Sequence, residues 1–305
     1  NGEWFDDAWN NMITSLVVLN DAKEDTVTHK AELADPITLL QFDRAIFDLV
    51  GSEILDSLFK IFEIASDDYV SATMLSTIDK CCFISSHYGL SSLYNGIIQK
   101  LIDISGLTGK KQYNDEAFEV ENIPLVEMIS ENDEGHETLS VSKFSVTLGR
   151  DYKGQLASIL LFRILKLNDT GNAISENNWT QLVDIVIELF RNKIIDPDVF
   201  AAFQRKFKLP PLPKPAAEHT IKKPKKINGS KTGFLSSFAS YLKGDEEPSI
   251  EEINCSSIAV NCLQICDLDE FWRNKFNFVD GRFVDVLLRR LDDTAKDQET
   301  LKLFV

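Results

Sequence analysis

The chain has 305 residues, 44% of them hydrophobic, and a formal net charge of −16. This hydrophobic content is enough for an extensive core, which excludes a wholly disordered chain and allows one large domain or two smaller ones. The acidic balance disfavours nucleic acid as a partner, because phosphate contacts need a surplus of Lys and Arg.

Residues 1–34 are expected to form a linker helix. The chain opens on Asn-Gly-Glu-Trp-Phe-Asp-Asp, without the basic start and apolar run of a secretion signal, so we do not expect secretion. It lacks an initiator Met and ends on Leu-Lys-Leu-Phe-Val, so we expect a piece of a longer protein. Apolar residues recur at helical spacing, at Trp9, Met12, Ile13, Leu16, Val17 and Leu19.

Helical periodicity continues through residues 35–305, which we expect to form a helical regulatory domain. A helix begins at Asp35-Pro36, an N-cap followed by Pro at the first helical position, and carries core candidates up to Val50. Strand-like alternation and hairpin signals are almost absent. Helix pairs that recur about every 40 residues predict an all-α fold of the HEAT or armadillo kind, an α-solenoid. Further helices are predicted at 52–65, 67–85, 90–104, 151–166, 176–190, 249–268 and 276–291.

Residues 106–147 interrupt this rhythm. They carry nine acidic residues against three basic ones and few periodic apolar positions, so we expect a flexible acidic insertion. The run Gly106-Leu-Thr-Gly109-Lys110 invites comparison with a phosphate-binding loop. That motif needs four residues between its glycines and a Ser or Thr after the Lys, whereas here two residues separate the glycines and Lys111 follows. A helix C-cap followed by a loop is the preferred interpretation.

A basic linker is predicted at residues 204–231. Nine basic residues against one acidic give this stretch +8, which leaves −24 for the rest of the chain. Its prolines, in Leu-Pro-Pro-Leu-Pro-Lys-Pro from Leu209, prevent a helix. The lysines also resemble a nuclear import signal, but Pro224 lies among them and the surroundings are acidic.

Residues 232–243 are predicted to form a short amphipathic helix that could contact a membrane. Its apolar face is Phe234, Leu235, Phe238, Tyr241 and Leu242, with Ser236, Ser237 and Ser240 opposite, and Lys222, Lys223, Lys225, Lys226 and Lys231 precede it. Burying five apolar side chains offers at most ~7–15 kcal/mol, which nearly cancels ~1–2 kcal/mol of ordering cost for each of a dozen residues. Attraction of up to ~1 kcal/mol per Lys then predicts weak, salt-sensitive binding. Alternatively, the helix packs against the helices that follow.

No catalytic or metal site is expected. Cys255, Cys262 and Cys266 fall on one helix face, where core packing explains them better than zinc, because no His follows. Cys81, Cys82 and His87 could form a thiol–imidazole pair, but no third group orients it. GxSxG, HExxH and kinase-like runs are missing, so we expect no enzyme and no cofactor.

The cellular compartment follows from cysteines and hydropathy. Five cysteines, an odd number without a secretion signal, indicate reduced thiols in the cytosol or nucleus. The strongest apolar stretches, 156–167 and 182–190, contain charged residues and fall short of the roughly 20 residues that span a bilayer. We therefore expect no membrane-spanning segment.

One stretch resembles a known family. Ile78-Asp-Lys-Cys-Cys-Phe-Ile-Ser-Ser-His-Tyr-Gly-Leu90, which includes His87, Tyr88, Gly89 and Leu90, resembles a motif directly downstream of the catalytic domain in large Golgi Arf guanine-nucleotide exchange factors. The run that follows, up to Asn95, agrees with the same family. Residues 179–196, 233–242 and 262–267 also match, so the resemblance covers about residues 35–278. The chain resembles the first homology region downstream of the exchange domain in fungal members of the GBF class.

This resemblance implies a cytosolic protein that associates peripherally with Golgi membranes, where the whole factor converts Arf from its GDP to its GTP form. The catalytic domain lies outside the matched region, so no catalytic residue is carried over. In the family the amphipathic helix is associated with lipid, which favours an anionic membrane surface as partner for residues 232–243. The alternative is a protein-interaction scaffold that binds an Arf or Rab GTPase, or neighbouring domains, without touching lipid. The 106–147 insertion departs from the animal pattern.

Overall fold

The computed structural model describes most of the domain predicted after residue 35. It covers residues 36–113, 123–132, 135–167, 174–195, 216–223 and 247–268, with Phe271, Val286 and Arg289. Two compact units divide between Ile46 and Phe47, and every contact discussed below lies within the second unit. The predicted linker helix of residues 1–34 lies outside the described residues, and the predicted domain boundaries stay a prediction.

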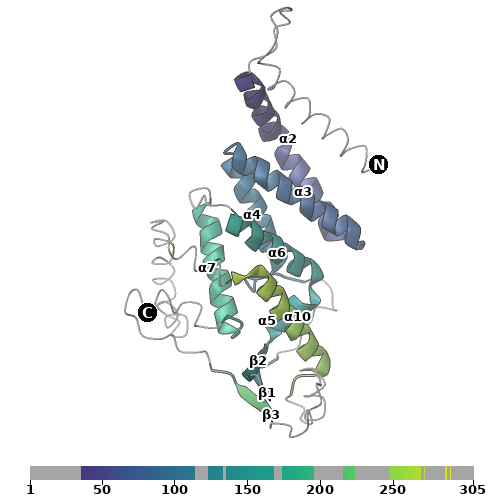
Figure 1. Ribbon diagram of the computed structural model, residues 1–305, viewed down its shortest axis with the longest axis vertical. Coiled ribbons are helices and arrows are strands. Elements are labelled where there is room, and N and C mark those ends of the chain that lie inside the picture. The colour runs from purple at the N-terminus through teal and green to yellow at the C-terminus, as the bar shows by residue number, and fades with distance from the viewer. Residues whose placement is uncertain are drawn as a thin grey trace, which may run out of the picture. The chain divides into compact units, whose positions relative to one another are not determined.

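Helices make up most of the described chain (Figure 1). Among these residues no helix combines the length and apolarity needed to cross a membrane. In chain order the elements are α2 (Pro36–Ile64), α3 (Asp68–His87), α4 (Ser91–Ser105), β1 (Val126–Asn132), β2 (Gly135–Val141), α5 (Lys143–Arg150), α6 (Tyr152–Leu167), α7 (Glu176–Arg191), β3 (His219–Lys223) and α10 (Ile250–Cys266).

Helix α2 is continuous where the sequence suggested a second helix after Val50. The prediction of a separate helix at 52–65 is wrong, because Gly51 lies inside one helix of 29 residues. A single glycine lowers helix stability without ending a helix unless a cap or proline follows. Gly51 is buried, and a Cβ there would lie 2.7 Å from Leu93 Cδ1, so glycine allows α4 to approach α2 closely.

Helices α4 and α6 form the centre of the main core. On α4, a pair of adjacent apolar residues, Ile97 and Ile98, is followed one turn later by a second pair, Leu101 and Ile102. Together they form a wide stripe of buried side chains, and α6 packs against it. Helices α3, α7 and α10 cover these two. The predicted helices 67–85, 90–104, 151–166, 176–190 and 249–268 are confirmed to within two residues at each end. A mostly helical fold is therefore confirmed, whereas the regular stacking of an α-solenoid stays a prediction.

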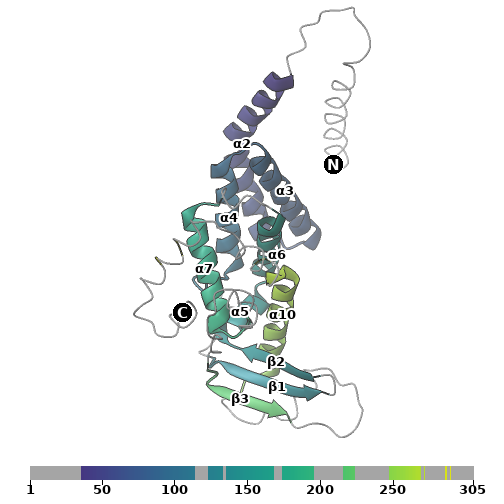
Figure 2. The ribbon, with the colours of Figure 1, turned by 60° about the vertical axis from the view of Figure 1, so that its left-hand side comes forward.

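A small sheet occupies part of the expected insertion (Figure 2). β1 pairs antiparallel with β2 and parallel with β3, in the order β2-β1-β3. The prediction of a flexible insertion at 106–147 is therefore wrong for β1, for β2 and for the part of α5 that lies within it. Alternation explains why they form: Val126 and Met128 on β1 face Val141 and Leu139 on β2, and all four are buried on one side of the sheet.

Helices α5 and α10 cover the buried side of the sheet. α5 begins with a capping box at Ser142 and packs along α10 through small residues. Ser145 Oγ lies 2.8 Å from Ser256 Oγ, and both side chains are buried. Together with the sheet these helices enclose a second hydrophobic cluster, which we call the sheet core: Val126, Met128, Leu139, Val141, Val146, Ile253 and Cys255.

Candidate functional site

The structure describes the first two predicted membrane-binding residues, Lys222 and Lys223, and the others lie outside the described residues. Outside are Phe234, Leu235, Phe238, Tyr241, Leu242, Lys225, Lys226 and Lys231. Lys222 and Lys223, which we placed in a linker spanning 204–231, instead end strand β3. The linker prediction is wrong for residues 219–223, because these residues pair with β1.

Strand β3 has one face in the sheet core and one face outward. In the parallel register Ile221 lies beside Met128, and Ile221 packs against the sheet core. Lys222 lies beside Ile129, on the opposite face, and its side chain is exposed. An exposed lysine therefore stands on the outer face of the sheet, immediately before the segment that the sequence identified.

The chain returns from this segment to the same small core. Ser249 caps α10 with a capping box, since Glu252 N donates to Ser249 Oγ (3.3 Å) and Ser249 N donates to Glu252 Oε2 (2.6 Å). In the first turn of α10, Ile253 is buried in the sheet core, against which Ile221 also packs. The described residues before and after 224–246 thus pack against the same cluster.

An ion pair fixes the outer face of the sheet to the end of α7. Lys193 Nζ lies 2.9 Å from Glu127 Oε2, and Ser140 Oγ donates to the Lys193 carbonyl at 3.2 Å. Lys193 has φ 54°, so its backbone makes a sharp turn after α7. These contacts tie the sheet to the main core independently of α5 and α10.

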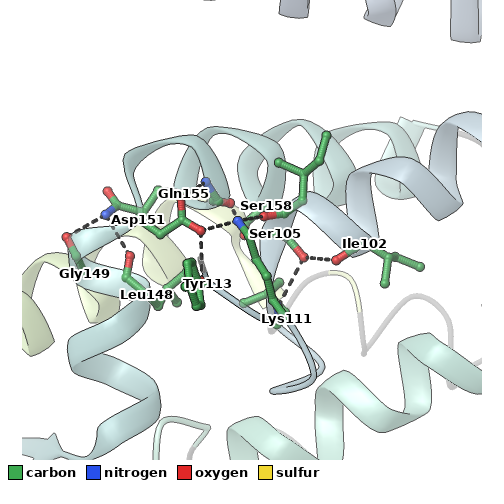
Figure 3. A network of polar contacts seen from close by, with 12 residues as sticks. Ile102, Ser105, Lys111, Tyr113, Leu148, Gly149, Asp151, Gln155 and Ser158 are labelled. Carbon is green, nitrogen blue, oxygen red and sulfur yellow. Dashed lines mark hydrogen bonds and ion pairs between the residues drawn. The ribbon is translucent and has the colours of Figure 1, made fainter. Parts of the chain in front are cut away.

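A buried polar network holds the loop between α4 and the sheet (Figure 3). Asp151, which is 5% exposed, accepts hydrogen bonds from Lys111 Nζ, from Tyr113 OH at 3.0 Å and from Gly154 N at 2.8 Å. Lys111 Nζ also donates to the Ile104 carbonyl at 2.6 Å. Burial raises the pKa of Tyr113, and the negative charge of Asp151 and the hydrogen bond to it raise this pKa further. The Tyr113 hydroxyl therefore remains a donor at neutral pH.

The lysines of the supposed phosphate loop have structural partners instead. Gly106 ends α4 in the left-handed conformation, with φ 67°, which confirms the predicted C-cap. Lys110 Nζ lies 2.7 Å from Asp184 Oδ2 on α7, and Lys111 pairs with Asp151. The two lysine ammonium groups thus hold the loop against the neighbouring helices.

The family motif at 87–90 forms the turn between α3 and α4. Leu90 N donates to the Ser85 carbonyl at 2.8 Å and Gly89 N donates to the Ser86 carbonyl at 3.1 Å, which is the Schellman arrangement. Gly89 has φ 66°, and Leu90 is buried behind it. The exposed end of the motif is aromatic, since His87 lies 6.3 Å from Phe83 and 5.1 Å from Tyr88 between ring centroids.

Replacing Gly89 by Ala is expected to lower the free energy of unfolding by about 1–2 kcal/mol, because a Cβ is disfavoured at positive φ. Space is not the reason, since a Cβ at Gly89 would meet nothing within 4 Å. Gly96, inside α4, is equally open but helical, so Gly96→Ala should raise stability by about 0.5–1 kcal/mol. Urea denaturation of both variants checks this; shifts of the same sign would contradict it.

All five cysteines are buried and form no disulfide. Burial, with smaller contributions from Asp79 and Cys81, raises the pKa of the Cys82 thiol to about 12. Burial also raises the pKa of Cys81. Neither thiol is therefore activated as a nucleophile. Cys255, Cys262 and Cys266 belong to the buried face of α10, which confirms that they pack in the core.

Comparison with known proteins relates the chain to exchange factors. No protein-family model matches it. It is 38% identical over 304 residues to "ARF guanine-nucleotide exchange factor 2" of Saccharomyces cerevisiae, covering 98% of this chain and 20% of that protein. "ARF guanine-nucleotide exchange factor 1" of the same yeast is 37% identical over 294 residues, again 20% of its length. "Uncharacterized protein C211.03" of Schizosaccharomyces pombe is 26% identical over 235 residues, 75% of this chain and 15% of that protein.

The chain thus spans about one fifth of the length of the yeast exchange factors that it matches. It is homologous to a part of Arf guanine-nucleotide exchange factors, which confirms the resemblance read from residues 78–95. Its position within such a factor stays a prediction.

Proposed function

We propose that this chain, homologous to a part of Arf guanine-nucleotide exchange factors, is a non-catalytic regulatory domain that helps to recruit its parent factor to Golgi membranes. In this proposal it is the first homology region after the catalytic domain. Residues 232–243 enter the boundary between headgroups and acyl chains, and the lysines before them attract anionic headgroups.

The observation that supports the proposal is that the described residues on either side of residues 224–246 pack against the same sheet core: Ile221 of β3 before them and Ile253 of α10 after them. Insertion of the segment would therefore hold the folded domain at the surface. Lys222, exposed on the sheet beside the exit point, extends the basic charge onto the folded part of the chain.

Flotation with phosphatidylcholine vesicles that contain phosphatidylserine tests this function. The intact chain should float with the vesicles, less at high salt than at low salt because the lysine contribution is screened. Phe234→Asp with Phe238→Asp should weaken binding about a hundredfold or more, because each phenylalanine contributes ~1.5–3 kcal/mol when buried.

Ser236→Asp with Ser237→Asp is the matched control, since it adds the same charge to the opposite face of the same predicted helix. This variant should retain most of the binding. Equal flotation of the two double variants would contradict the proposal.

A second candidate function, a protein-interaction scaffold, is favoured by apolar side chains exposed on α2 and α3. Leu49, Ile64, Tyr69 and Phe83 are each more than 70% exposed. Exposed large apolar side chains mark a docking surface where they form a contiguous patch. An Arf or Rab GTPase or a neighbouring domain of the parent factor would bind there, and Phe234→Asp with Phe238→Asp would leave localisation unchanged.

A further inference from the structure

Helix α2 exposes a line of apolar side chains at coiled-coil spacing. Val50, Ile54, Ile61 and Ile64 are 37%, 41%, 41% and 82% exposed, and the exposed Ser57 stands between them. The five positions follow one another in steps of four, three, four and three residues. A repeat of about 3.5 residues is the one that keeps a helix face against a partner helix. We call these five residues the α2 seam.

The seam lies on a different side of α2 from the residues that enter the main core. Leu55, Phe59 and Phe62 are buried in that core. Val50 to Ile64 spans about 21 Å of helix, and residues three and four apart on a helix are neighbours, so the seam is a continuous surface. Single exposed apolar residues are ordinary, whereas a contiguous apolar patch rimmed by polar residues marks an interaction site.

The residues around the seam are mostly acidic. Residues 48–68 contain six acidic residues and one basic residue, Lys60. Glu53, Asp56 and Glu63 are exposed on one side of the seam, and Lys60 is exposed among them. Charges that flank an apolar helix seam choose the partner by its sign, because like charges brought together across an interface are costly.

This charge argues against two possible occupants. An anionic membrane would bring its headgroups against the carboxylates beside the seam, and attraction to such a membrane needs Lys and Arg. A second copy of the chain would bring the same acidic residues against themselves, because a two-fold interface joins identical patches, and each copy has a net charge of −16. A partner with apolar and basic side chains meets neither obstacle.

We propose that the α2 seam binds a basic amphipathic helix of a partner protein, one whose apolar stripe is flanked by Lys or Arg. The inference goes beyond membrane recruitment. It rests on the second candidate function, the protein-interaction scaffold, and gives that function a defined surface and a partner chemistry. Helix-to-helix recognition of this kind reads apolar anchors three and four residues apart.

The polar residue in the middle of the seam is compatible with a covered interface. Ser57 Oγ already donates to the Glu53 carbonyl at 2.8 Å, so a partner helix can cover this hydroxyl without leaving its proton unpaired. Ser57 is also small, which lets the two helices approach closely at the centre of the seam. The isoleucines on either side then serve as the anchors.

Fluorescence anisotropy with the intact chain and a labelled synthetic peptide tests the proposal. The peptide is helical, with Leu at the a and d heptad positions and Lys at e and g, and a matched peptide carries Glu in place of Lys. At low salt the chain should bind the Lys peptide about tenfold or more tightly than the Glu peptide. High salt should reduce this difference, because the charges are screened.

Two double variants separate the seam from general attraction to an acidic protein. Ile54→Asp with Ile61→Asp should weaken binding of the Lys peptide about tenfold or more, although it adds negative charge, because a carboxylate would be buried in the interface. Ile258→Asp with Ile265→Asp adds the same charge to isoleucines of α10 that are 46% and 65% exposed, and should not weaken binding.

Reversing the charge beside the seam provides a variant that leaves the apolar residues intact. Glu53 and Glu63 are both exposed, so Glu53→Lys with Glu63→Lys should keep the fold. It should also make the Glu peptide bind more tightly than the Lys peptide. Equal binding of the two peptides to the unmodified chain would overturn the proposal, as would equal binding of the Lys peptide to the Ile54/Ile61 and Ile258/Ile265 variants.

The other occupants have their own signatures. A dimer seen by light scattering that Ile54→Asp with Ile61→Asp dissociates would assign the seam to a second copy and overturn the proposal. Loss of vesicle flotation in the same variant would assign the seam to lipid and overturn it too. Failure of the membrane test with Phe234→Asp and Phe238→Asp leaves the peptide results unchanged, so the two proposals fail separately.

Discussion

Replacing Gly149 by Ala is expected to destabilise the protein by about 3 kcal/mol, the upper end of what overpacking usually costs. A Cβ at Gly149 would lie 1.9 Å from the Cys255 carbonyl oxygen and 2.7 Å from Cys255 Cα. These are backbone atoms of α10, so no side-chain rotation can relieve the clash. Helices α5 and α10 would have to separate, which opens the Ser145–Ser256 contact and the sheet core.

Chemical denaturation measures the loss, and hydrogen exchange locates it. Amides of α5, α10 and the sheet should exchange faster in Gly149→Ala, whereas those of α4 and α6 should change little. Gly96→Ala makes the same substitution at an open position of α4 and should stabilise the chain. If Gly149→Ala lowers the free energy of unfolding by less than about 0.5 kcal/mol, which is the size of an ordinary surface effect, the close approach of α5 and α10 is contradicted.

Helices were predictable because their signals are local. Apolar spacing at 97, 98, 101 and 102 predicts a buried face of α4 without any knowledge of its neighbours, and Ser249 with Glu252 predicts the start of α10. Gly51 shows the limit of this reasoning. A glycine inside a helical pattern suggests a break in the helix. Gly51 instead allows a close contact with Leu93, a residue far away in the sequence.

The sheet was missed because its stability is not local. β1 and β2 lie in a strongly acidic stretch, and β3 lies among lysines, so composition predicted solvated chain in both places. The alternation of Val126 with Met128 and of Leu139 with Val141 could have revealed the hairpin. The parallel pairing of Ile221 with β1 joins residues about ninety positions apart, which no short pattern in the sequence encodes.

The membrane-binding site stays a prediction. Periodicity and charge suggested residues 232–243 and the lysines before them, and these residues lie mostly outside the described ones. Neither signal could reveal that Lys222 belongs to a strand, or that Ile221 and Ile253, on either side of residues 224–246, pack against the same sheet core.

Replacing Asp151 by Ala is expected to destabilise the protein by about 3–5 kcal/mol, the cost of breaking a buried ion pair by removing one partner. Asp151 precedes the first residue of α6, and its side chain accepts from Gly154 N and Tyr113 OH as well as from Lys111. Removing it leaves the partly buried Lys111 ammonium with only the Ile104 carbonyl among these acceptors. Thermal and urea unfolding should both register the loss.

Two further variants separate the charge from the helix cap. Asp151→Asn keeps an oxygen that can accept from Gly154 N, so it should cost less than Asp151→Ala. Asp151→Ala with Lys111→Met removes both charges and should recover part of the stability, because no unpaired ammonium remains in the core. If the double variant is no more stable than Asp151→Ala, the cap and the Tyr113 contact carry the effect, and the ion pair does not hold the loop. Recovery would instead mean that the unpaired Lys111 ammonium causes part of the loss, and that the Lys111–Asp151 pair holds the loop that follows α4.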